Sequence, residues 1–283
     1  MIDVKDRVPT YPGRVILTPV AGKANTFDMV RADEPIEPGT PINKALFDSM
    51  ISEIEAMRTQ FNNTLFAISQ RALLSDVGVG TEISLMENGI LVPFIKIQNN
   101  YEGVTGSLLI RKHCVTKMPL MSSGDTKYEN CRADLWLTNE YFGMLDAATQ
   151  AVALEVSIEI SVNYDGTLRS SYISRKAFLL SSEEYNVQSE SAIAYEGDAI
   201  TYFDNNLRRV ATFDGSPTDY YTRTYSGRTL VTDSITTEGS LGNIENNTVV
   251  EAGIRPVLLL PNSYEVTVGV PSTENVMATA EVL

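Results

Sequence analysis

The stretch AGIRPVLLLP, residues 252–261, places a permanent cation and a proline at the centre of an otherwise apolar run. Such a run is expected to be buried. Gly253 allows close backbone approach or an unusual dihedral, and Pro256, which has no N–H to donate, fits only a sheet edge or a bulge. Arg255 keeps its charge, so a buried guanidinium must be forked onto carbonyl oxygens or a carboxylate. We therefore interpret Gly253, Arg255 and Pro256 as structural residues.

Strands also dominate the sequence upstream of this stretch. Residues 89–98 (GILVPFIKIQ), 106–115 (GSLLIRKHCV) and 153–162 (ALEVSIEISV) have the composition of strands. Residues 132–150 carry apolar side chains at helical spacing, which predicts one or two short helices. From residue 165 onward, short strands alternate with turn sequences such as DGT, DNN and DGSPTD. The order predicts a mixed α+β fold with long loops, and neither a repeat array nor a doubly wound sheet.

A long helix is predicted before these strands, over residues 41–75. Thr40 is a candidate N-cap and Pro41 suits the first helical position. Apolar residues then recur three and four positions apart, and Leu46, Ile51 and Leu65 widen the stripe. The helix either packs on its own domain or forms a homo-oligomeric coiled coil, and we favour a trimeric coiled coil. The candidate oligomerisation residues are Phe47, Met50, Ile54, Met57, Phe61 and Ile68.

The N-terminal residues 1–40 are rich in proline and glycine, which excludes a long helix and favours extended pieces and turns. A segment of this kind has little core of its own. We expect it to become ordered by lying on a partner.

Composition limits the classes of partner. The formal net charge is −14 over 283 residues, which argues against nucleic acid or an anionic membrane surface as the main partner. The N-terminus has no apolar signal-peptide region, and no stretch is long enough to span a membrane. We expect a protein that is made in a cytoplasm and is not inserted into a membrane.

Signatures of catalysis and of metal binding are nearly absent from the sequence. The single histidine, His113, lies beside Cys114, and neighbours on a strand point to opposite faces, so they form no catalytic dyad. Cys114 and Cys131 are expected to be reduced, partly buried thiols. The acidic turns at 202–207 and 213–219 lack a full series of Ca²⁺ ligands and fit plain turns better. We therefore predict no enzymatic activity, no cofactor and no metal.

Aromatic and arginine residues are interleaved over residues 202–228, and both types are enriched at binding hot spots. Alternation predicts that Phe203 and Phe213 are buried and that Tyr220 or Tyr221, with Arg223 and Tyr225, is exposed. The candidate ligand-binding residues are Tyr202, Tyr220, Tyr221, Arg223, Tyr225 and Arg228.

Four motifs in sequence order carry a resemblance to a known family. They are LWLTNEYFGMLDAATQAVALEVSI, ISRKAFLLSSEEYNV, AITYFDNNLRRVATFDGSPTDYYTRT and GIRPVLLLP. Together they resemble the DUF6273 family, C-type-lectin-like domains that are frequent in phages and prophages of Firmicutes, over roughly residues 85–266. The family usually has Tyr-Trp-Thr-Arg-Ser-Pro where this chain has YYTRTYSG, so Tyr221 stands in place of the Trp. The resemblance implies a C-type-lectin-like head, in which the chain end returns as a strand.

Residues 6–48, DRVPTYPGRVILTPVAGKANTFDMVRADEPIEPGTPINKALFD, are similar to the leader of Firmicutes phage tail and baseplate-associated proteins, which fastens a fibre to the virion. The expected organisation is a virion-attachment arm (1–40), an oligomerisation helix (41–75), a lectin-like head (76–266) and a β-prone tail (267–283). The expected function is that of a tail or baseplate fibre or tip protein located in the virion. It would be a homotrimer that binds other virion proteins through residues 1–40 and a host-surface saccharide or protein through its head.

Three alternatives remain open at the sequence level. A head fibre or capsid decoration protein would have the same architecture without a receptor role. An enzyme resembling the formylglycine-generating oxidases would need Cys114 and Cys131 as a copper-binding pair. A soluble host adhesin would need an export signal.

Overall fold

The computed structural model describes residues 8–9, 15–31, 35–37, 44–121, 127–164, 167–187, 196–225, 231–245 and 250–269. The chain divides into two units, Met1–Phe61 and Asn62–Leu283. Among the described residues strands form most of the regular structure, and apart from α1 (Lys44–Ser69) the helices are short. The predicted mixed α+β class is confirmed.

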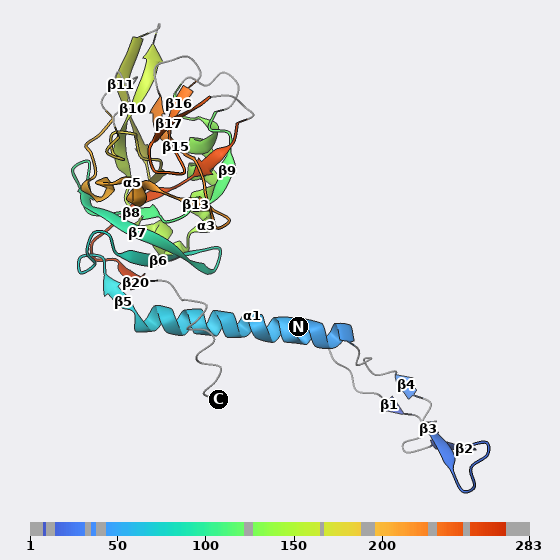
Figure 1. The fold of residues 1–283 in the computed structure, drawn as a ribbon. Coiled ribbons are helices and arrows are strands. Elements are labelled where there is room, and N and C mark those ends of the chain that lie inside the picture. Colours follow the sequence, from blue (N-terminus) through green and yellow to red (C-terminus); the bar gives the residue numbers. More distant parts are fainter. Residues whose placement is uncertain are drawn as a thin grey trace. The chain divides into compact units, whose positions relative to one another are not determined.

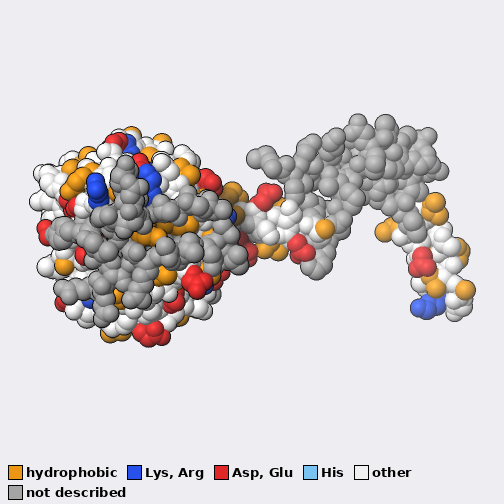
Figure 2. All heavy atoms as spheres, turned by 90° about the horizontal axis from the view of Figure 1, so that it is seen from above, with side chains coloured by type: hydrophobic (Ala, Val, Ile, Leu, Met, Phe, Trp, Pro, Cys, Tyr) orange, Lys and Arg blue, Asp and Glu red, His pale blue; other side chains and the backbone are white. Residues whose placement is uncertain are grey.

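The first unit begins with two small antiparallel pairs of strands (Figure 1). β1 (Val8–Pro9) pairs with β4 (Pro35–Glu37), and β2 (Val15–Pro19) pairs with β3 (Phe27–Arg31). Every residue of β2 is exposed, and Phe27 and Met29 of β3 are exposed as well. Hydrophobic side chains accordingly lie on the surface of this hairpin (Figure 2). The hairpin has no core of its own.

The long helix α1 spans Lys44–Ser69 and is shorter than predicted. The predicted end at residue 75 is wrong, because Arg71–Leu73 form strand β5, which pairs with a strand near the C-terminal end of the described chain. Long-range pairing overrides the helical pattern there. The expected cap at Thr40 and Pro41 lies outside the described residues, as does the side chain of Ile68.

A seven-stranded sheet forms one part of the second unit. In spatial order its strands are β12 (Ala177–Phe178), β19 (Val257–Leu260), β8 (Val104–Arg111), β7 (Ile90–Tyr101), β6 (Glu82–Glu87), β20 (Glu265–Val268) and β5. Asn88 and Gly89, both with positive φ, make the tight turn between β6 and β7. The predicted strands at 89–98 and 106–115 are β7 and β8. β20 runs across the expected head–tail boundary at residue 267, so that boundary is wrong; residues 270–283 lie outside the described chain.

A five-stranded sheet forms another part of the unit, and the β10–β11 hairpin extends away from the seven-stranded sheet (Figure 1). The spatial order of the five strands is β17 (Leu241–Glu245), β16 (Val231–Ile235), β15 (Tyr220–Tyr225), β18 (Ala252–Ile254) and β9 (Thr116–Met118). The described part of the second unit also contains two hairpins: β10 (Val156–Tyr164) with β11 (Thr167–Arg175), and β13 (Thr212–Phe213) with β14 (Ser216–Pro217).

Short helices connect the strands of the second unit. α2 (Arg132–Trp136), the π-helical turn η1 (Leu137–Tyr141) and α3 (Phe142–Met144) follow one another without a break, and α4 (Ala147–Val152) comes next. These elements confirm the helices predicted over residues 132–150. η2 (Thr201–Phe203) and α5 (Asn206–Arg209) lie later in the chain. None of the described helices is long and apolar enough to cross a membrane.

The stretch 252–261 carries the chain from the five-stranded sheet to the seven-stranded sheet. β18 ends at Ile254 and β19 begins at Val257, so Arg255 and Pro256 form the crossing. Because Pro256 lies between the two strands, its missing N–H costs no hydrogen bond of a β-ladder. The Pro256 carbonyl accepts a hydrogen bond from the Arg111 N–H at 2.9 Å. A Cβ at Gly253 would lie 2.5 Å from the Cys114 sulfur, so close packing is what requires glycine. The expected close approach at Gly253 and the exclusion of Pro256 from the ladder are confirmed.

Candidate functional site

The expected exposure of the aromatic and arginine residues on β15 is wrong. Tyr220, Tyr221, Arg223 and Tyr225 are all between 0% and 4% exposed. The reason is that β15 lies inside the five-stranded sheet and both of its faces are covered, so alternation along the strand does not distinguish an outer face. These four residues form no surface for a ligand.

The other predicted residues of this cluster have different positions. Tyr202 is half-buried on η2, where its ring lies 5.2 Å from the guanidinium carbon of Arg208. Phe203 is fully buried as predicted, whereas Phe213 is only half-buried. Arg228 lies outside the described residues.

Arg223 is a structural cation with each of its five N–H donors engaged. Its guanidinium forms an ion pair with Glu184, with contacts of 2.5 and 3.0 Å, and both side chains are fully buried. Backbone carbonyls of Glu159, Leu179 and Glu196 accept the remaining donors. The Tyr101 hydroxyl donates to the same Glu184 carboxylate at 2.5 Å. Arg223 thus links β10, at Glu159, to the irregular segments that carry Leu179, Glu184 and Glu196.

Arg255 and Arg209 play comparable roles. Arg255 donates to the carbonyls of Arg111 and Arg209 and to the Tyr220 hydroxyl, at 2.9 to 3.0 Å. The prediction that a buried Arg255 is forked onto carbonyl oxygens is confirmed. Arg209 donates to the carbonyls of Tyr185, Asn186, Phe203 and Gly239 and to the Asn206 side chain. Arg209 and Arg223, which belong to the segment that suggested a binding surface, therefore hold irregular backbone together as Arg255 does.

His113 and the two cysteines also have structural surroundings. The His113 Nδ1 atom lies 2.6 Å from the Thr212 hydroxyl, and burial together with Lys112 and Arg111 lowers the pKa of its ring. Burial raises the pKa of the Cys114 thiol to about 11, which keeps it protonated. Cys131 caps α2 by accepting a hydrogen bond from the Asp134 N–H. Both cysteines are free, as predicted, but they are buried and not partly buried. No group of three or more metal-ligating side chains occurs within the described part of the chain.

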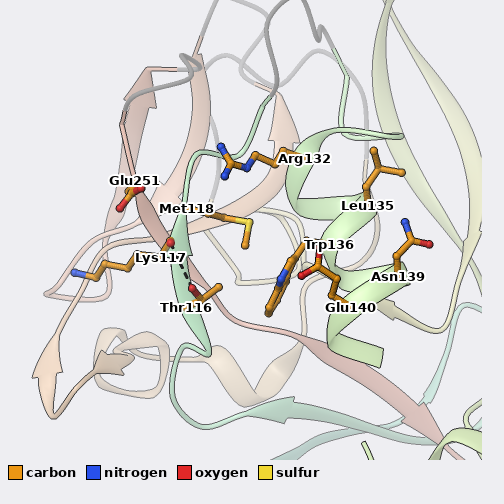
Figure 3. A pocket seen from close by; sticks show the side chains of 9 residues that line it. All are labelled: Thr116, Lys117, Met118, Arg132, Leu135, Trp136, Asn139, Glu140 and Glu251. Atoms are coloured by element: carbon orange, nitrogen blue, oxygen red, sulfur yellow. Dashed lines mark hydrogen bonds between the residues drawn. The ribbon is translucent and has the colours of Figure 1, made fainter. Parts of the chain in front are cut away.

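A groove of about 490 Å³ with polar and aromatic lining lies among the described residues, and sequence reasoning did not identify it. Its walls come from β9, from α2 with η1, and from the residue just before β18 (Figure 3). The volume lies in the range of small-ligand sites. The lining residues are Thr116, Lys117, Met118, Arg132, Leu135, Trp136, Asn139, Glu140 and Glu251.

Helical spacing places the groove residues of one wall together. Arg132, Trp136 and Glu140 follow one another four positions apart, which aligns them along one side of the α2–η1 helix. On the opposite wall Met118 reaches from β9 toward the Trp136 indole (Figure 3). Trp136 is partly buried, whereas Arg132, Asn139 and Glu140 are exposed. The arrangement places one aromatic side chain, Trp136, on the same helical wall as the hydrogen-bonding groups of Arg132, Asn139 and Glu140.

Buried polar contacts fix the helical wall in place. Asp134, fully buried, accepts two hydrogen bonds from Arg175 of β11 at 2.6 and 2.7 Å. Behind the groove, the Tyr141 ring stacks on Trp136 with centroids 5.8 Å apart. The Tyr141 hydroxyl donates to Glu87 at 2.7 Å, and Glu87 pairs with Arg111. The indole is therefore supported by residues of the seven-stranded sheet.

The signal for this site was present in the sequence. Trp136 is the only tryptophan of the chain and stands within a helical pattern that also carries arginine, asparagine and glutamate. The apolar neighbours Leu137 and Tyr141, which are fully buried, made the segment look like core alone. The opposite wall comes from residues 116–118 and 251, and their distance along the chain hid the groove.

Comparisons with known proteins identify one family. The model of a domain of unknown function, DUF6273, matches residues 105–262, which is more than half of the chain and includes all the residues that line the groove. No curated protein and no solved structure matches the chain.

Proposed function

The chain belongs to the DUF6273 family, and from that premise we propose that it is a bacteriophage tail or baseplate fibre or tip protein that binds the host surface. In this proposal residues 1–40 attach to other virion proteins and α1 forms a homotrimer. The second unit, with the expected C-type-lectin-like fold, contacts the host cell through the groove at Trp136.

The observation that carries the proposal is the exposed apolar stripe of α1. Its large apolar side chains are 41% to 62% exposed in the single chain, which is a costly arrangement for a helix in water. The exposed members are Phe47, Met50, Ile51, Ile54, Met57, Phe61 and Leu65. An unpartnered stripe of this length favours association with another surface.

The spacing of the stripe indicates that its partner is another copy of the same helix. Phe47, Ile54 and Phe61 are seven residues apart, and Met50 and Met57 occupy the intervening positions, which is the a and d pattern of a coiled coil. Ile51 and Leu65, at e positions, widen the apolar surface beyond a two-helix seam and favour three helices.

Charges beside the stripe support a parallel arrangement. Glu53 stands at a g position and Arg58 at the following e position, and both are exposed. In parallel helices the g residue of one chain lies beside the next e residue of its neighbour, so Glu53 and Arg58 would form interchain ion pairs. Parallel chains would present all their heads at the same end, as a fibre tip requires.

The β2–β3 hairpin supports attachment through the N-terminal unit. Its apolar side chains Val15, Ile16, Leu17, Phe27 and Met29 are all exposed. A two-stranded hairpin without a core is marginal on its own. Burial against a virion protein would stabilise it.

The location of the protein on phage particles tests the proposal. Antibody fragments against the second unit should label the tail end of virions in electron microscopy and should block adsorption to host cells. Labelling of the capsid without inhibition of adsorption would favour a decoration protein. Absence of the chain from purified virions would overturn the proposal.

A further inference from the structure

We propose that the groove at Trp136 is a site for a neutral saccharide, with the indole as the stacking platform. The inference rests on the proposed function, since it names the class of ligand that the host-binding site would take. It goes beyond that function because attachment alone does not specify a sugar, a charged polymer or a protein.

The charges of the groove favour a neutral ligand. The Lys117 ammonium is directed away from Trp136 (Figure 3) and lies 5.5 Å from the centroid of the Phe213 ring. The remaining charged lining residues are therefore one cation, Arg132, and two anions, Glu140 and Glu251. A site for a phosphate-rich polymer would need an excess of lysine and arginine, and the chain as a whole has a net charge of −14. An anionic ligand would meet two carboxylates in the groove and a repulsive field around it.

The hydrogen-bonding groups match a ligand with many hydroxyls. A hydroxyl both donates and accepts, so it pairs with carboxylates, amides and cations alike. The groove offers carboxylate acceptors, the donors of Arg132, and the amide of Asn139, which both donates and accepts. These groups extend from exposed positions, where exchanging water for ligand hydroxyls carries little desolvation cost.

The Trp136 indole supplies the apolar contact that a sugar ring needs. One face of a pyranose carries C–H groups and packs on an aromatic ring, while its hydroxyls point outward to the rim. Trp136 is held from behind by the stack on Tyr141, and Tyr141 is held by Glu87. A ring fixed in this way loses little conformational entropy when a ligand binds. Met118 adds an adaptable apolar surface on the opposite wall.

The single tryptophan makes the test direct, because all tryptophan fluorescence of the full-length chain comes from Trp136. The full-length protein is first applied to an array of neutral hexose, N-acetylhexosamine and rhamnose oligomers, with poly(glycerol phosphate) as the anionic comparator. The best neutral oligomer is then titrated into the protein while fluorescence is recorded under tryptophan-selective excitation. We expect saturable binding to a neutral oligomer and a saturable change in Trp136 emission with the same Kd.

Substitutions inside and outside the groove test whether the saccharide binds at the groove or elsewhere on the surface. Trp136→Ala should weaken binding by about tenfold or more, as expected for an aromatic anchor. Asn139→Ala, an exposed position that removes no packing, should weaken binding severalfold with an unchanged melting temperature. Tyr172→Ala is the matched control, since it removes an aromatic ring that is 62% exposed on β11, and it should bind as the wild type does.

The remaining outcomes distinguish failure of the inference from failure of the proposed function. Binding to poly(glycerol phosphate) alone, or saccharide binding unaffected by Trp136→Ala and Asn139→Ala, would overturn the saccharide site while leaving host attachment intact. Loss of host-cell binding in these variants without binding to any saccharide would assign the groove to a protein ligand and overturn the inference. If the wild-type chain binds no host cells, the proposed function itself fails.

Discussion

At the scale of single residues, arginine has a different role from the one its sequence context suggests. Arg209 and Arg223 lie among aromatic residues in the sequence, a composition typical of binding surfaces, whereas Arg255 lies in the apolar stretch 252–261. In the structure each is buried and donates to backbone carbonyls of several segments. Long irregular loops leave carbonyls without ladder partners, and a planar fork of donors satisfies several of them at once.

The adjacent pair Arg208 and Arg209 tests this role. Arg209→Ala should lower the free energy of unfolding by about 3 kcal/mol, because it leaves several buried carbonyls unsatisfied. Arg208→Ala, at an exposed position, should cost less than about 1 kcal/mol. Urea denaturation of both variants measures the difference. Equal effects would contradict a structural role specific to Arg209.

A buried carboxyl at Glu196 should make stability depend on pH. Burial raises the pKa of Glu196 to about 7, although its oxygens accept hydrogen bonds from the Ser161 N–H and the Thr224 hydroxyl. At a pH between the pKa of the unfolded chain and the higher pKa of the folded chain, the folded chain keeps the proton on Glu196 and the unfolded chain has released it. The free energy of unfolding should therefore fall as pH rises from about 4.5 to about 7.

Glu196→Gln removes this titration. The stability of the wild type relative to the variant should decline by about 3 kcal/mol or less as pH rises from about 5 to about 8. Urea unfolding across that range measures the change, with the exposed Glu155→Gln as control. A pH-independent difference between wild type and Glu196→Gln would show that Glu196 keeps an ordinary affinity for its proton in the folded chain.

At the scale of elements, local patterns predicted some segments and failed at others for definable reasons. The composition of residues 89–98 and 106–115 predicted β7 and β8, because that signal is local. The end of α1 was misplaced because β5 forms only when β20, almost two hundred residues later, pairs with it. β15 was recognised as a strand region, but its faces were misassigned because the cover on each side comes from distant segments.

The passage of β18 beside Cys114 gives a prediction at this scale. Gly253→Ala would place a Cβ 2.5 Å from the Cys114 sulfur and 3.0 Å from the Tyr220 Cβ. The strand must shift, so we expect a loss of about 2 kcal/mol or more in the free energy of unfolding. Adding Cys114→Ala removes the sulfur that the new Cβ would meet, so the double variant should regain part of the lost free energy of unfolding.

Gly143→Ala is the control for this experiment, since a Cβ there meets no atom within 4 Å in helix α3. It should be neutral or slightly stabilising. Thermal unfolding compares the three variants. A Gly253→Ala protein as stable as the wild type would contradict the close approach.

At the scale of the whole molecule, the sequence predicted the order of parts better than the site. The proline-rich arm, the long helix and the strand-rich second unit are each marked by composition and periodicity within one segment. The groove combines residues from 116 to 251, and no local pattern connects them. Sequence reasoning chose instead the most aromatic segment, where burial and not binding explains the composition.

The central claim, that α1 assembles three chains, is best tested by point variants in the full-length protein. A truncation at Asp76 would remove β5 and the fully buried Leu74, which belong to the second unit, and would damage that unit as well. Ile54→Glu combined with Phe61→Glu places charges in the apolar stripe. Ser52→Glu combined with Thr59→Glu adds the same charge on the opposite side of the helix.

The measurement is the solution mass by light scattering. The wild type and the Ser52→Glu/Thr59→Glu variant should have a mass of about 93 kDa, three times the 31.1 kDa of one chain. The Ile54→Glu/Phe61→Glu variant should have the mass of one chain, 31.1 kDa. A wild-type protein that is itself monomeric, or a stripe variant that stays trimeric, would contradict assembly through α1.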